Sequence, residues 1–227
     1  MPDHQPRDHQ PTDTARLAAA TLLDIEAVLI RPEEPFTFTS GRKSPVYVDC
    51  RRIISFPRAR ATLMRLGVEQ LGRSAGVEAF DAIAGGETAG IPFAAWLADL
   101  MGLPMVYVRK KPKGFGRNAQ IEGCFAEGAR VLLVEDLATD GGSKLTFVEA
   151  LRTAGADVAH CFVVFHYGIF PQSTARLAEQ GVALQGLATW WDVLAVAEQS
   201  GRLSEEQVAE VRGFLQDPDG WAAKRAD

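Results

Sequence analysis

Two adjacent carboxylates that follow an apolar run offer the clearest chemistry in the chain. Residues 131–134 are apolar, and Glu135 and Asp136 come directly after them, ahead of a turn that contains Gly141 and Gly142. Carboxylates at the end of a buried strand are costly unless they meet hydroxyl groups, cations or water. Ribose hydroxyls and hydrated Mg²⁺ are suitable partners. The glycines and the helix start after them could also hold a phosphate, through backbone N–H groups and the helix dipole.

A second glycine-rich turn precedes this acidic turn. Residues 82–92 read AIAGGETAGIP, an apolar run that ends in Gly85 and Gly86 and passes Gly90 into a helical pattern. Glycine lets the backbone approach a ligand closely, so this segment predicts a second phosphate or pyrophosphate cradle. An ordinary solvated strand-to-helix connection is the alternative for either turn. The acidic turn has neither the Walker pattern nor the GxGxxG dinucleotide pattern, which excludes the two commonest nucleotide-binding loops.

A basic segment lies between the two turns. Residues 109–117 contain five cations and no acid, namely Arg109, Lys110, Lys111, Lys113 and Arg117. In a chain whose net charge is −5, this concentration predicts a polyanionic ligand, with a solvated basic loop as the alternative. A lysine brought over a reacting centre could neutralise a departing anion.

The composition excludes several classes of protein. With 227 residues, 47% hydrophobic and 23% charged, the chain is neither disordered nor collagen-like. Its net charge of −5 argues against a general nucleic-acid or membrane binder. Three widely spaced cysteines indicate neither a disulfide framework nor a thiolate zinc site, and no apolar run approaches the ~20 residues that span a bilayer. We therefore predict a cytoplasmic protein that binds neither nucleic acid nor membranes.

The elements that must position these residues follow from hydrophobic periodicity. Residues 57–190 alternate between helix and strand patterns, and the strands are continuous apolar runs. Such runs need a sheet that is covered on both faces, so this segment predicts a doubly wound, mostly parallel α/β core. Ligands of such sheets bind beyond the carboxyl ends of the strands. The acidic, glycine-rich and basic segments all follow strand candidates, so they are expected to meet there.

Shorter segments flank this predicted core. Residues 1–14 are polar and predict a disordered tail. Residues 15–56 predict a helix that extends to residue 30, followed by a polar hairpin that turns at residues 40–43. Residues 191–227 predict terminal helices that are broken near residues 200 and 217.

Several stretches of the chain resemble the type I phosphoribosyltransferases. Residues 131–143 resemble the family's signature for phosphoribosyl pyrophosphate (PRPP): four apolar residues, two acids, small or apolar residues, then Thr139 and glycine. The stretches FTFTSGRKSPVYVD, GGETAGIP, VYVRKKPKGFG and IEG resemble the bacterial orotate branch in order and spacing. The resemblance covers about residues 15–215. It implies the type I phosphoribosyltransferase fold with an N-terminal hood and C-terminal helices.

The resemblance also implies a reaction, in which orotate and PRPP give orotidine 5′-monophosphate and pyrophosphate in pyrimidine biosynthesis. Glu135 and Asp136 would hold the ribose hydroxyls, and Mg²⁺ would arrive with PRPP and water near them, with no direct protein ligand. Thr139 would touch both the phosphate and orotate. The 5′-phosphate would lie on the turn formed by Leu137, Ala138, Thr139, Asp140, Gly141, Gly142 and Ser143. Arg109, Lys110 and Lys113 would bind pyrophosphate, with Lys113 as the catalytic lysine. A homodimer is implied, with the 109–117 loop shared between subunits.

A few positions depart from the family pattern. Phe115 stands where many members have histidine, and Asp140 stands where a small residue is usual. We expect the Asp140 side chain to point away from the phosphate or to contact Mg²⁺-bound water. The group that binds the carboxylate of orotate is left open, with Ser40, Lys43 and Arg51 of the hood as candidates.

Two other functions are consistent with the same motifs. The first is a phosphoribosyltransferase for another nucleobase, against which the hood sequence SGRKSPVYVD argues. The second is a regulator that senses PRPP or binds RNA without turnover, which the departures at Phe115 and Asp140 favour and the intact Lys113 opposes.

Overall fold

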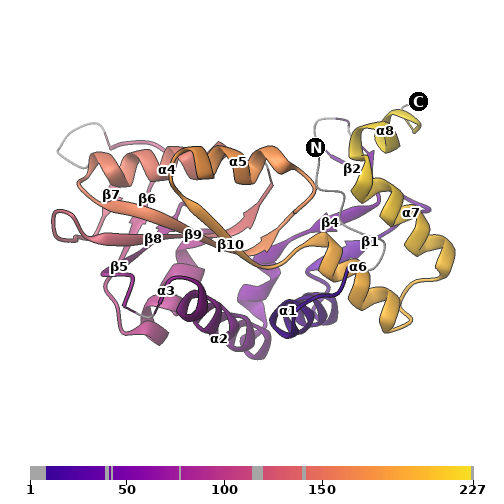
Figure 1. The fold of residues 1–227 in the computed structure, drawn as a ribbon, viewed down its shortest axis with the longest axis horizontal. Coiled ribbons are helices and arrows are strands. Elements are labelled where there is room, and N and C mark those ends of the chain that lie inside the picture. The colour runs from indigo at the N-terminus through magenta and orange to yellow at the C-terminus, as the bar shows by residue number, and fades with distance from the viewer. Residues whose placement is uncertain are drawn as a thin grey trace.

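A mostly parallel sheet with helices on both faces forms the centre of the protein (Figure 1). The computed structural model describes residues 9–38, 41, 43–76, 78–113, 120–139 and 142–225. The six strands have the order β10-β9-β8-β5-β6-β7. They are β5 (Ala82–Gly86), β6 (Met105–Val108), β7 (Ile121–Glu122), β8 (Arg130–Ala138), β9 (Asp157–His166) and β10 (Ala183–Ala188). Each neighbouring pair is parallel except β6 and β7. The predicted doubly wound, mostly parallel α/β core is confirmed.

Two helical layers cover the sheet, as Figure 1 shows. The helices α1 (Asp13–Asp24), α2 (Pro57–Ser74) and α3 (Gly90–Met101) lie on one face, and α4 (Gly142–Thr153) and α5 (Pro171–Glu179) lie on the other. Side chains alternate across a strand, so Phe162 of β9 packs in the core under α2 and α3 while Val163 packs in the core under α4 and α5. Both faces therefore need apolar residues, which explains the continuous apolar runs.

The central strand β8 carries the acidic pair to the carboxyl edge of the sheet. Leu132 and Val134 pack in the core under α3, and Val131 and Leu133 pack in the core under α4. By the same alternation, Glu135 continues the row that faces α4, and Asp136 continues the row that faces the opposite layer. The two carboxylates, although adjacent in sequence, therefore point to opposite faces of the sheet edge.

The N-terminal hood and the C-terminal helices lie together at one end of the molecule (Figure 1). In the hood, β1 (Val28–Ile30) pairs with β4 (Val46–Val48), β2 (Phe36–Thr37) pairs with β3 (Lys43–Ser44), and the short 3₁₀ helix η1 (Cys50–Ser55) follows. The C-terminal helices are α6 (Trp190–Gln199), α7 (Glu205–Gln216) and α8 (Pro218–Ala223). A hydrogen bond of 2.8 Å from Gln207 of α7 to Glu33 joins the two parts. The predicted hairpin, terminal helices and breaks near residues 200 and 217 are confirmed.

The predicted boundaries are wrong at three places in the first 56 residues. The helix expected to reach residue 30 ends at Asp24, because residues 28–30 form β1 and pair with β4. The tail expected to be disordered to residue 14 is described from His9, and the Thr12 hydroxyl caps α1 by accepting the backbone N–H of Ala15 at 3.2 Å. The end of the expected hairpin is η1, where Asp49 accepts the backbone N–H of Arg51 at 3.1 Å.

Candidate active site

A cavity of about 800 Å³ opens at the carboxyl ends of β5 and β8. The turn between β5 and α3 and the residue pair Glu135 and Asp136 form its floor, η1 of the hood forms one wall, and the first turns of α4 form another. Its lining includes Arg51, Ile54, Glu87, Thr88, Ala89, Pro92, Lys110, Glu135, Asp136, Ser143, Thr146 and Phe147. The predicted meeting of acidic, glycine-rich and basic segments at this edge is confirmed, because Glu135 and Asp136, residues 87–89 and Lys110 line one cavity.

Glu135 is buried, with 8% of its surface exposed, although it reaches the cavity. Its Oε2 atom lies 3.6 Å from the ammonium of Lys144, and its Oε1 atom is buried without a hydrogen-bond partner among the described residues. Burial raises the pKa of Glu135 to about 7, against the opposing effect of Lys144. Because Glu135 lines the cavity, its carboxylate is placed to receive hydroxyl donors from a ligand.

The two glycines nearest the acidic pair make room for Glu135. A Cβ atom at Gly86 would lie 2.0 Å from Glu135 Oε1 and 2.7 Å from the Phe147 ring. A Cβ atom at Gly90 would lie 2.4 Å from the carbonyl oxygen of Val134 and 2.8 Å from Glu135 Oε1. The predicted close approach of a ligand to these glycines stays a prediction. The structure adds a second role for Gly86 and Gly90, because a side chain at either position would collide with Glu135.

Asp136 is half-buried and faces the hood side of the cavity. Burial raises the pKa of Asp136, while the positive charges of Lys144 and Arg51 oppose the shift. Arg51 lines the same cavity with 62% of its side chain exposed, and its Nε donates to Asp49 Oδ1 at 2.7 Å. Of the hood candidates for the carboxylate of orotate, Arg51 therefore reaches the cavity. Lys43 is not among the lining residues, and Ser40 lies outside the described residues.

The three cations predicted to bind pyrophosphate separate into two groups. Lys110 lines the cavity, and its backbone N–H donates to Glu87 Oε2 at 2.7 Å. Arg109 and Lys113 instead contact Glu122 of β7, with 3.5 Å between Arg109 Nη1 and Glu122 Oε1. Lys113 holds the pKa of Glu122 below its usual value, and Arg109 adds to this effect. In the described part of the chain, neither Arg109 nor Lys113 lines the cavity.

The predicted phosphate turn is described in part. Leu137 and Ala138 are the last residues of β8, and the side chain of Ala138 is fully buried, so any ligand contact there falls to its backbone. Thr139 follows the strand and is half-buried. Gly142 and Ser143 begin α4, and Ser143 is exposed to the cavity. Asp140 and Gly141 lie outside the described residues, as do Phe115 and Arg117.

Sequence reasoning missed the residue that neutralises the acidic pair. No role was predicted for Lys144 from the sequence, yet this residue is buried beside Glu135. A lysine just after the loop that follows the two carboxylates is the sequence signal that could have identified it.

Among the residues that the structure describes, the end of β9 supplies no lysine or arginine to this edge of the sheet. The residues there are His166, which lies 3.0 Å from Ser173 Oγ, and the buried Tyr167.

Comparisons with known proteins place this site in a family. A family model described as "Phosphoribosyl transferase domain" matches residues 69–173. An orotate phosphoribosyltransferase from Cereibacter sphaeroides is 61% identical over 217 residues, which are 95% of this chain and 94% of that protein. The chain belongs to the orotate phosphoribosyltransferase family. The family predicted from the sequence motifs is therefore confirmed.

Solved structures agree with this assignment. The orotate phosphoribosyltransferase of Aeropyrum pernix matches with a TM-score of 0.68 and 33% identity, over 82% of this chain and 99% of that one. The UMP synthase of Leishmania donovani matches with a TM-score of 0.72 and 29% identity, over 88% of this chain and 42% of that one. The type I phosphoribosyltransferase fold is thus confirmed, and the cavity at the carboxyl edge of its sheet is the candidate active site. No helix among the described residues has both the length and the apolar character needed to cross a membrane.

Proposed function

We propose that the protein transfers the 5-phosphoribosyl group of PRPP to orotate, giving orotidine 5′-monophosphate and pyrophosphate in pyrimidine biosynthesis. The observation that carries the proposal is the acidic pair Glu135 and Asp136 in one cavity with Lys110 and the start of α4. A sugar that carries hydroxyls, a phosphate and a pyrophosphate needs acceptors, N–H donors and cations in one site. Membership of the family and the PRPP signature at residues 131–143 support the same substrates.

Each group at the cavity then has a task. The ribose hydroxyls donate to Glu135 and Asp136, and the 5′-phosphate lies on residues 137–143 at the N-terminal end of α4, where backbone N–H groups favour an anion. Thr139 touches this phosphate and orotate. Departure of pyrophosphate leaves positive charge on the ribose ring, and cations on the leaving group lower the barrier. Orotate is an anionic nitrogen nucleophile, so no strong general base is needed.

Magnesium is proposed as the metal that accompanies PRPP. The described residues contain no group of three or more His, Cys, Asp or Glu side chains able to hold a metal ion. Mg²⁺ keeps several waters and binds substrate phosphates readily, so the donor set at Glu135 and Asp136 fits a hydrated ion that the pyrophosphate brings. When bound, Mg²⁺ neutralises charge on the departing pyrophosphate. Lys110 adds a protein cation beside it.

The protein is further proposed to act as a homodimer that shares the 109–117 loop between subunits. The positions of Arg109 and Lys113 support this proposal. Both form ion pairs with Glu122, and of the three cations proposed to bind pyrophosphate, Lys110 alone lines the cavity of its own chain. A loop that reaches the cavity of the neighbouring subunit would bring Arg109 and Lys113 to the pyrophosphate bound there.

The protein is also proposed to be cytoplasmic. The free thiols of Cys50, Cys124 and Cys161 support a reducing location of this kind.

Arg51 is proposed to receive the carboxylate of orotate. It lines the cavity on the hood side, and its side-chain contact with Asp49 uses only the Nε atom. A guanidinium presents further N–H donors in a fork that matches a carboxylate. The proposed role of Arg51 therefore rests on its position in the cavity and on the charge of orotate. A neutral base has no carboxylate to pair with the guanidinium, so Arg51 would contribute less to its binding.

A base panel tests the proposed function. The purified protein is supplied with PRPP and Mg²⁺ together with orotate, uracil, adenine or hypoxanthine, and the loss of each base is followed by absorbance. We expect consumption of orotate alone, and dependence on Mg²⁺. Consumption of a purine in place of orotate would indicate a transferase for another base, and PRPP binding without turnover of any base would indicate a regulator.

A further inference from the structure

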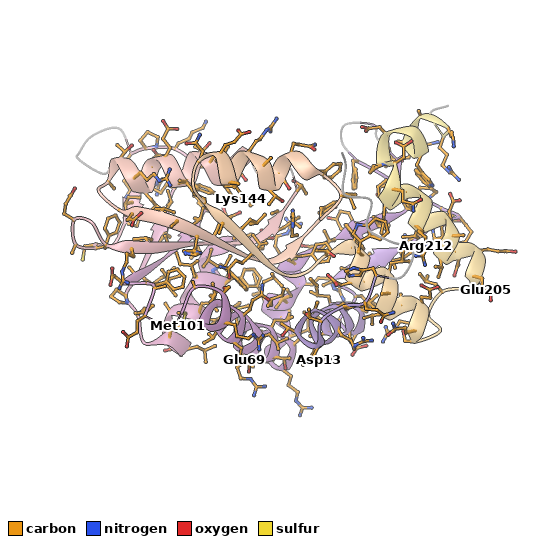
Figure 2. The ribbon with its side chains drawn as sticks, viewed as in Figure 1. Asp13, Glu69, Met101, Lys144, Glu205 and Arg212 are labelled. Atoms are coloured by element: carbon orange, nitrogen blue, oxygen red, sulfur yellow. The ribbon has the colours of Figure 1, made fainter. Side chains whose placement is uncertain are left out.

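Lys144 is a buried cation to which the proposed reaction gives no task. It lies in the first turn of α4, between this helix and the sheet (Figure 2), and only 5% of its surface is exposed. Among the described residues it is the one lysine or arginine that is buried. Its ammonium lies 3.6 Å from Glu135 Oε2, and the side chain of Glu135 is itself only 10% exposed.

Burial of the Lys144–Glu135 pair carries a desolvation penalty, which suggests that the pair serves a function. Taking two charges out of water is expensive, and leaving either one alone is worse. Glu135 cannot move away freely, because Gly86 and Gly90 leave just enough space for its Oε1 atom. One carboxylate oxygen is therefore held by Lys144, and the position of the other is fixed by the walls of the site. The carboxylate is pre-organised in a way that a solvent-exposed acid would not be.

We propose that Lys144 is a positioning residue for the ribose site: it orients the Glu135 carboxylate and favours its charged form before PRPP arrives. The inference rests on the proposed function, because it assumes that Glu135 accepts hydrogen bonds from the ribose hydroxyls. Lys144 has no contact with the substrate. It acts through Glu135 alone.

The charge of Lys144 matters because the surroundings favour a neutral Glu135. Burial and the neighbouring Asp136 raise the pKa of Glu135, while Lys144 and Lys110 lower it. Around Lys144 itself stand Asp136, Cys50 of η1, and Cys161 and His166 of β9. None of these neighbours except Asp136 carries negative charge near neutral pH, since burial raises the pKa of Cys50 and brings that of Cys161 to about 12. Removal of Lys144 would therefore raise the pKa of Glu135 further and increase its protonated fraction at neutral pH, which leaves fewer acceptor sites for ribose.

The test compares PRPP binding by calorimetry in the presence of Mg²⁺ from pH 6 to pH 9.5. Lys144→Met removes the charge and keeps much of the volume, Lys144→Arg keeps the charge, and Lys224→Met is a matched control at an exposed lysine of the C-terminal segment. We expect Lys144→Met to bind PRPP at least tenfold more weakly at pH 7, with the deficit shrinking toward pH 9. Lys144→Arg should recover most of the affinity, and Lys224→Met should match the wild type.

A double variant keeps the test decisive if Lys144→Met does not fold. Lys144→Met with Glu135→Gln removes both charges, so it should fold, bind PRPP weakly and lack the pH dependence. Wild-type affinity and pH profile in Lys144→Met would overturn the inference. If Lys144→Met does not fold, a double variant that also fails to fold, or one that folds and keeps the wild-type pH dependence, would overturn it as well. Binding of PRPP does not require turnover, so the two proposals fail separately. A wild type that binds PRPP without consuming orotate would contradict the proposed function, and the PRPP affinities of the Lys144 variants would still test the role of Lys144.

Discussion

Gly86→Ala is the substitution whose effect on the acidic pair can be worked out most fully from the structure. The added methyl group would lie 2.0 Å from Glu135 Oε1 and 2.7 Å from the Phe147 ring, distances that atoms do not tolerate. To relieve these contacts, either the Glu135 carboxylate, which is paired with Lys144, or the Phe147 ring, which is 3% exposed and packed in the core, would have to shift. Overpacking of this kind costs about 1–3 kcal/mol of stability. For a chain of this size, that corresponds to a fall in melting temperature of roughly 2–12 °C.

The same change should weaken PRPP binding. A hydrogen bond to a charged group contributes about 1.5–3 kcal/mol, so displacement of the Glu135 carboxylate should raise the dissociation constant of PRPP roughly 10-fold to 100-fold. Urea unfolding measures the stability, and calorimetry with Mg²⁺ measures the affinity. Gly213→Ala of α7 is the matched control, because a Cβ atom there meets nothing within 4 Å. Unchanged stability and unchanged PRPP affinity in Gly86→Ala would refute the packing account of the site.

Three further changes test other parts of the site. Arg51→Ala should raise the KM of orotate about tenfold, as expected for a lost charged hydrogen bond, and leave the KM of PRPP within about twofold; an equal effect on both substrates would contradict the assignment. Glu122→Gln should free Arg109 and Lys113 and tighten inhibition by pyrophosphate about twofold to fivefold, since exposed ion pairs contribute ~0.2–1 kcal/mol; weaker inhibition would show that Glu122 instead supports binding. Burial raises the pKa of Glu135 from 4.5 to about 7, so the folded protein binds more protons than the unfolded chain in that window, and this group's contribution to stability falls as pH rises through it. Urea unfolding without ligand should therefore show wild type losing stability relative to Glu135→Gln between pH 4.5 and pH 7, and a constant difference would argue against the burial effect.

The core of the fold was predictable because its signals are strong and local. β8 and β9 read as continuous apolar runs, and both are covered on two faces. The boundary at residue 30 failed for a different reason. Residues 28–30 continue the apolar spacing of α1, and only their pairing with β4, nearly twenty residues later in the chain, makes them a strand. The periodicity of residues 15–30 contains no information about a partner strand as distant in sequence as β4.

The lining of the cavity was predictable in its two acids and in one of the three cations proposed to bind pyrophosphate. Glu135, Asp136 and Lys110 meet at the sheet edge as the strand ends require. The sequence could not show that Arg109 and Lys113 would face Glu122, because that depends on the antiparallel pairing of β7 with β6. Lys144 was missed because a lysine in an amphipathic helix normally lies on the solvated face, and only the packing of α4 against β8 and β9 buries it.

The consumption of orotate in the presence of PRPP and Mg²⁺, by the wild type and by Lys113→Ala, tests the central claim most directly. Orotate absorbs in the ultraviolet, so its conversion can be followed continuously. We expect steady turnover by the wild type and a loss of roughly 10²–10³-fold in Lys113→Ala, the range seen when a charge-stabilising group is removed from an active site. The melting temperature of Lys113→Ala should match the wild type, because Lys113 is exposed. No turnover by the wild type would contradict the proposed reaction, and equal turnover by both proteins would contradict the role of Lys113.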